Sequence, residues 1–161
     1  MFSLVDRSLR LRDNGAKGAR RGKEQSVKGM VAWSFGQAEK EPNPCNVLLG
    51  IEAYRILKEE EKNTGEEVVL VAQWEVAAAI REIIGFPVPY VVEKHRHEGE
   101  CLNSKEVMAQ AADIFLNLGI TEVIPIANPF LHLFACRQFV RRFGFTPLRR
   151  KIRRLGFYGD S

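Results

Sequence analysis

The sequence has few cysteines, and no two of them are close together. Cys45, Cys101 and Cys136 form no CxxC motif, which argues against a disulfide framework and against a thiolate zinc site. Residues 1–23 also lack the apolar region of a signal peptide. These absences are typical of a protein in a reducing compartment, and we expect it in the cytoplasm.

Long apolar segments are absent as well. A membrane-spanning helix needs roughly 18 or more uninterrupted apolar residues. The best candidate, residues 123–135, is interrupted by prolines, an asparagine and a histidine, so we expect no transmembrane segment. The apolar fraction of 45% in 161 residues is still enough for one domain with a packed core.

Glycine-rich phosphate-binding motifs are the third absence. Neither a GxGxxG nor a Walker A sequence occurs, and such motifs let backbone N–H groups approach a phosphate at a helix N-terminus. The sequence therefore argues against a classical dinucleotide or nucleoside-triphosphate site. It identifies no cofactor.

The net charge of +4 conceals a strong asymmetry along the chain. Residues 1–28 have a net charge of +5 and residues 137–161 a net charge of +7, whereas residues 29–136 carry −8. The basic ends could fold back onto the acidic body, remain solvated, or contact nucleic acid or an anionic surface. The run Arg149–Arg154 is central to the last hypothesis. A further alternative is a homo-oligomer in which the basic C-terminus packs on a neighbouring acidic body.

Apolar runs and helical patterns alternate after a basic, glycine-containing segment. Residues 1–28 are typical of a flexible N-terminal arm, and residues 29–161 of a single domain. Continuous apolar runs predict strands at 30–35, 67–72, 88–92, 121–126 and 146–152. Between them, helices are predicted at 46–63, with Asn46 as the cap, and at 75–84, 103–118 and 129–143. This order predicts a three-layer Rossmann-like α/β fold with a mostly parallel sheet of about five strands.

Ligands of such folds bind beyond the carboxyl ends of the strands, so the loops there contain the candidate site. His95 and His97 could share a metal with nearby acids, but no third ligand is fixed, and we predict no metal site. Asn103 to Glu106 has the pattern of a helix capping box. His132 falls in the first turn of a helix, where the neutral imidazole is favoured. It is either a general base or a hydrogen-bonding residue.

Three segments resemble one protein family. Glu100-x-x-Asn103-Ser104-x-Glu106 resembles the E-x-x-x-N-T-x-E-N-A segment of the YdcF/SanA/ElyC-like bacterial domain-of-unknown-function family. After the apolar strand 123–126, residues 128–132 are similar to its T-S-x-x-H segment, and residues 139–145 to its F-R-R-x-G-F ending. The resemblance covers about residues 29–148. It implies a Rossmann-like fold with a polar pocket at the strand ends.

The resemblance also implies which residues line that pocket. Glu100 and His132 would be an acid/base pair, suited to hydrolysis or group transfer if the protein is an enzyme. Carried over residue by residue, the resemblance places Glu100, Asn103, Ser104, Glu106 and His132 in the pocket. From their place in the loops at the strand ends, Gly36, Gln37, Gln73 and Asn128 are expected as further ligand contacts. Where the family has S-G-G and an arginine, this chain has Ala72-Gln73-Trp74 and Ala135, which removes the main anion contacts.

Two functional hypotheses follow. The first is an uncharacterised YdcF/SanA-like domain that binds a polar small molecule at the strand ends, with nucleotide-like ligands among the candidates. The second is a non-enzymatic binding module that contacts nucleic acid or an anionic surface through its basic termini. Whether the protein is an enzyme stays open at this point.

Overall fold

The structure, a computed structural model, describes residues 27–35, 43–93 and 102–153. Its centre is a five-stranded sheet in the order β3-β2-β1-β4-β5, and every neighbouring pair of strands is parallel. The strands are β1 (Lys28–Ala32), β2 (Val68–Gln73), β3 (Tyr90–Val92), β4 (Glu122–Ile126) and β5 (Thr146–Pro147). The predicted parallel α/β sheet is therefore confirmed.

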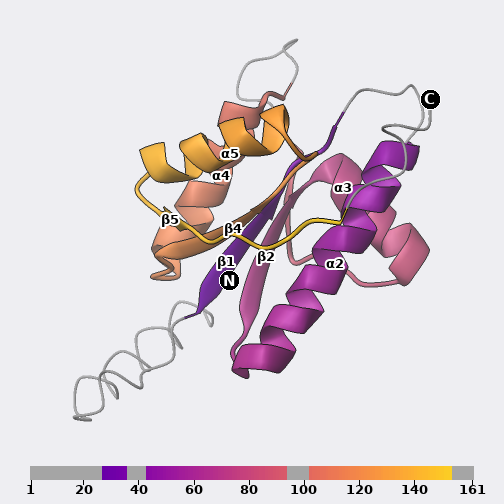
Figure 1. Ribbon diagram of the computed structural model, residues 1–161, viewed down its shortest axis with the longest axis horizontal. Helices are drawn as coiled ribbons and strands as arrows, with labels where there is room; N and C mark the ends of the chain where they lie inside the picture. The colour runs from indigo at the N-terminus through magenta and orange to yellow at the C-terminus, as the bar shows by residue number, and fades with distance from the viewer. Residues whose placement is uncertain (1–26, 36–42, 94–101, 154–161) are drawn as a thin grey trace.

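Helices cover both faces of this sheet (Figure 1). They are α2 (Pro44–Thr64), α3 (Trp74–Ala79), which continues into a π-helical turn (Ile80–Ile84), α4 (Ser104–Asn117) and α5 (Leu131–Arg142). Helices α2 and α3 pack on one face, and α4 and α5 on the other. Within the described ranges, no helix is long and apolar enough to cross a membrane.

Alternation along the strands divides the core between the two faces. Met30 and its register partners on β2 and β4 point toward α2 and α3, whereas Val31 and its β2 partner point toward α4 and α5. Because helices cover both faces, both sets of side chains are apolar. This explains why the strands are continuous apolar runs in the sequence.

The strand order places a topological switch at β1. The chain moves from β1 to β2 and β3 on one side, and α4 then returns it to β4 on the other side of β1. The loops that follow β1 and β4 consequently diverge to opposite faces of the sheet. This is where doubly wound folds bind ligands.

Helix ends match the predicted stop signals better than the predicted starts. Gly65 and Gly85 adopt left-handed backbone conformations directly after α2 and the π-helical turn, which glycine favours. The predicted cap at Asn46 is wrong: Asn43 is the N-cap of α2, and its Oδ1 accepts from the Asn46 N–H at 2.9 Å. The predicted start of α5 at Pro129 is also wrong, because the helix begins at Leu131.

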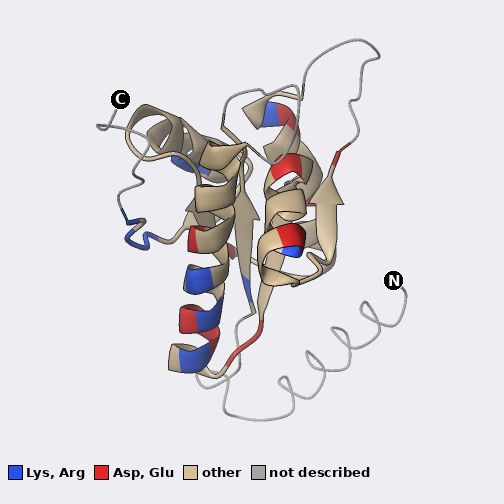
Figure 2. Cartoon of the chain, turned by 90° about the vertical axis from the view of Figure 1, so that its right-hand side faces the viewer, with Lys and Arg blue, Asp and Glu red and all other residues tan. Residues whose placement is uncertain are grey.

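The basic segment after β5 lies against acidic side chains of α2. Arg150 donates two hydrogen bonds to Glu60, at 2.7 and 2.9 Å, and Arg153 binds Glu52 at 2.6 Å. Both carboxylates are buried, and Figure 2 shows basic and acidic residues alternating along α2. These two arginines therefore match one of the alternatives predicted for the basic C-terminus, in which it folds back onto the acidic body.

Candidate functional site

The candidate site begins with the residues that follow β1. Trp33 is fully buried and donates its indole N–H to the backbone oxygen of Ser104 at 3.0 Å. A buried tryptophan needs such a partner for its one polar atom. The contact ties the carboxyl end of β1 to the start of α4, although the two are distant in sequence.

Two buried amide side chains then fix the backbone of the next residues. Gln73, at the end of β2, accepts from the Ser34 N–H at 3.0 Å, and Asn46 of α2 accepts from the Phe35 N–H at 2.8 Å. These backbone donors have no strand partner, so the side chains satisfy them. Gln73 was predicted to contact a ligand, and in the structure its Oε1 positions the loop that leads into the site.

Ser104 and His132 come together beside the carboxyl ends of β1 and β4, on the face of the sheet that α4 and α5 cover. Asn103 caps α4 by accepting from the Glu106 N–H at 2.8 Å, which makes Ser104 the first residue of the helix. His132 lies in the first turn of α5. The Ser104 Oγ and His132 Nε2 atoms are 3.0 Å apart, a hydrogen bond whose direction depends on the imidazole tautomer.

Burial determines the charge state of this imidazole. It lowers the pKa of His132 below the ordinary value of 6.5, so the ring is neutral at neutral pH. Its Nδ1 atom is buried and has no hydrogen-bond partner among the residues that the structure describes. The Phe35 ring lies beside it, with 6.2 Å between ring centroids. A neutral imidazole can accept the Ser104 proton or donate its own.

Cys136 is a neighbour that sequence reasoning missed. It is buried one turn after His132 on α5, near the Ser104 hydroxyl. Burial raises the pKa of the Cys136 thiol far above its ordinary value, despite the opposing effect of Ser104. The thiol is therefore protonated and is no nucleophile. The four-residue spacing from His132 was the signal that could have placed it there.

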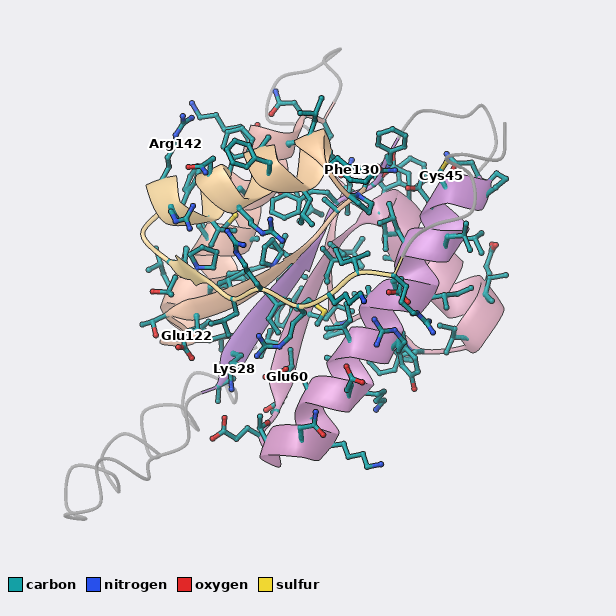
Figure 3. All side chains as sticks on the ribbon, in the orientation of Figure 1. Lys28, Cys45, Glu60, Glu122, Phe130 and Arg142 are labelled. Atoms are coloured by element: carbon teal, nitrogen blue, oxygen red, sulfur yellow. The ribbon has the colours of Figure 1, made fainter. Side chains whose placement is uncertain are left out.

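Exposed apolar side chains flank His132 in the sequence, where α5 begins. Phe130 is 76% exposed, and Leu131 and Phe134 beside it are also exposed. Phe130 has a φ of 74°, an unfavourable conformation for a bulky residue. Figure 3 shows the Phe130 side chain at the edge of the molecule. Strain of this kind clusters at functional sites.

The remaining predicted site residues divide into two groups. Asn128 is buried, and its backbone oxygen accepts from Leu133. The Glu106 carboxylate accepts from Gln110 at 3.2 Å. The other group lies outside the described residues and comprises Gly36, Gln37, Glu100 and the two histidines His95 and His97. Within the described ranges, no three potential metal-ligating side chains are grouped.

The comparisons with known proteins add no identification. No protein-family model matches the chain, and no curated protein matches it. The resemblance to the YdcF/SanA/ElyC-like family therefore stays a prediction.

Proposed function

We propose that this protein binds a polar small molecule at the carboxyl ends of β1 and β4, through Ser104 and His132. The observation that carries the proposal is the 3.0 Å contact between these two side chains at the topological switch point. Parallel α/β sheets bind ligands at this point. A hydroxyl and a neutral imidazole are also groups that bind polar ligands in pockets.

The chemistry of the pair favours hydrogen bonding over charge pairing. Since burial keeps His132 neutral, its imidazole offers one donor and one acceptor rather than a cation. Phe35 beside the ring, together with exposed Phe130, provides apolar surface for a planar group. A ligand with a ring and several hydrogen-bonding atoms, such as a nucleoside, fits both features.

The proposal extends to catalysis by the same two side chains. A neutral histidine in contact with a serine hydroxyl can accept its proton, which is the first requirement of nucleophilic or general-base chemistry. Glu100, predicted as the acid of the pair, lies outside the described residues. Its role is therefore tested by substitution.

Thermal denaturation with a panel of candidate ligands tests the proposal. The panel contains the four ribonucleosides, their 5′-monophosphates, sugars and amino acids. At least one compound should raise the melting temperature of the wild-type protein, because a ligand that binds only the folded state stabilises it. His132→Ala, Ser104→Ala and Glu100→Gln should each abolish or strongly reduce that rise.

A matched control substitution, at a hydroxyl that does not contact a histidine, is available on the opposite side of the molecule. Thr64→Ala removes a hydroxyl of similar size at the far end of α2, and it should leave the ligand-induced rise unchanged. If no compound stabilises the wild type, or if His132→Ala and Ser104→Ala retain the full rise, the proposal is wrong.

A further inference from the structure

Three arginines gather on the α5 side of the sheet, away from the candidate site. Arg137 and Arg141 are one turn apart on α5, so they occupy the same face of that helix. Arg149 follows β5, which packs against α5. The cluster thus combines residues from two elements that the fold brings together.

These arginines differ from the basic residues next to them. Arg150 and Arg153 bind buried carboxylates of α2, on the opposite face of the sheet. In the part of the chain that the structure describes, the guanidiniums of Arg137, Arg141 and Arg149 form no salt bridge with a carboxylate. Adjacent residues of one segment, Arg149 and Arg150, therefore have opposite electrostatic environments.

Arg137 has the least favourable environment of the three. Its Nε atom is buried and has no hydrogen-bond partner among the described residues. Burial, and then the positive charges of Arg149 and Arg141, lower the pKa of its guanidinium. Buried donors are nearly always satisfied by a protein group, a water or an ion. An anion would satisfy the donor and offset the repulsion among the three charges.

Stabilisation of the α5 terminus does not account for the whole cluster. Cations in the last turn of a helix interact favourably with its dipole, which explains Arg141 and Arg142. Arg137 is more than a turn from the helix end, and Arg149 lies outside the helix. These two need another reason to be brought together.

We propose that Arg137, Arg141 and Arg149 form a binding site for the phosphate group of a small phosphorylated ligand. Guanidinium groups bind phosphate oxygens through paired N–H donors, and several of them together are typical of phosphate recognition. The three side chains supply the positive charge, and the Arg137 Nε–H supplies a buried donor already inside the cluster.

This phosphate site is separate from the proposed small-molecule site. Helix α5 begins at Leu131, directly after Phe130 near the strand ends, and ends at Arg142, and Figure 3 shows Phe130 and Arg142 at opposite ends of the helix. The arginine cluster is on the half that ends at Arg142. The two proposals can therefore fail independently, since one depends on His132 and the other on arginines.

Calorimetric titration with inorganic pyrophosphate tests the site in the full-length protein. Wild type should bind one pyrophosphate saturably. Arg149→Gln and Arg137→Gln should each weaken binding by roughly tenfold or more, the size expected for a lost charged hydrogen bond. Arg137→Lys keeps the charge but loses the Nε–H donor, and it should also weaken binding.

Arg81→Gln is the matched control, because Arg81 is an exposed arginine within the π-helical turn, in the other helix layer. This variant should bind pyrophosphate like wild type. Arg149 is exposed, so its replacement tests the site even if Arg137→Gln does not fold. The proposal is overturned if wild type shows no saturable binding, if Arg81→Gln weakens binding as much as Arg149→Gln, or if single-stranded RNA binds and pyrophosphate does not.

Discussion

At the scale of single residues, burial decides what His132 can do. The same imidazole on the surface would be partly protonated near neutral pH, since an ordinary histidine has a pKa of about 6.5. In the structure it is half-buried, contacts the Ser104 hydroxyl and lies beside Phe35. Its position in the first turn of a helix was predictable from the sequence. Its contact with Ser104 was not, because it depends on how α4 and α5 pack on the sheet.

The lowered pKa of His132 leads to a pH-dependent stability. Below about pH 6.5 the His132 side chain of the unfolded chain takes up a proton. In the folded protein the same side chain takes up a proton only at a lower pH, because its pKa is lowered. Stability contributed by the neutral ring is therefore present above pH 6.5 and is lost as the pH falls through this window. Urea denaturation from pH 7.5 to 5.0 should show this loss in wild type and a smaller one in His132→Gln. An equal loss of stability with falling pH in both proteins would show that His132 is not its cause.

At the scale of secondary-structure elements, the sequence predicted the ends of helices better than their starts. All four predicted ends lie within one residue of the observed ones. Glycines follow these helices, and a left-handed residue at a helix end is a local requirement that the sequence shows. Asn43 and Asn46 are the same residue type three positions apart, and each could cap a helix. Asn46 instead accepts from the Phe35 N–H, a tertiary contact between α2 and the chain after β1. No local pattern distinguishes the two roles.

Asn43 and Asn46, at the start of α2, should differ in their effect on stability. Asn43→Ala removes a helix cap and should cost about 1 kcal/mol. Asn46→Ala leaves a small cavity and deprives the Phe35 N–H of its partner, and it should cost about 2–3 kcal/mol. Chemical denaturation of both variants measures the difference. An Asn46→Ala variant no less stable than Asn43→Ala would show that this contact does not stabilise the fold.

At the scale of the whole molecule, charge distribution connects the C-terminal segment to α2. The asymmetry between an acidic body and basic ends was plain from the sequence, and it left the partner of the basic residues open. The structure pairs Arg150 and Arg153 with Glu60 and Glu52 but leaves Arg149 near other arginines. Which arginines pair with carboxylates could not be predicted from the sequence, because it depends on the direction in which each side chain points from the segment after β5.

Acid should weaken the attachment of this segment. Burial raises the pKa of the Glu52 carboxyl, but hydrogen bonds from Arg55 and Arg153 outweigh that effect and lower it to about 2. The unfolded chain protonates near the ordinary value of 4.5, so this stability is present above pH 4.5 and is lost as the pH falls toward 2. We expect the Glu52 interactions to contribute on the order of 2 kcal/mol to the free energy of unfolding. The contribution is not larger because solvent screens the exposed part of Arg153.

Glu52→Gln provides the measurement. At pH 7 the variant should be less stable than wild type by about that amount, and the difference should shrink as the pH falls below 4.5. Trypsin should also cleave after Arg150 or Arg153 faster in Glu52→Gln than in wild type. A difference that is constant from pH 7 to pH 3 would show that the carboxylate charge is not the cause.

The proposed ligand binds where the ends of β1 and β4 meet Ser104 and His132. The most direct test is a heteronuclear NMR titration of the labelled protein with the compound that stabilises it most. The signal of the Trp33 indole N–H reports on the site, because this group donates to the Ser104 backbone oxygen. We expect shifts at this signal, at residues 34–35 and at residues 128–132. Saturable shifts confined to other parts of the molecule, with the Trp33 indole signal unmoved, would contradict the claim.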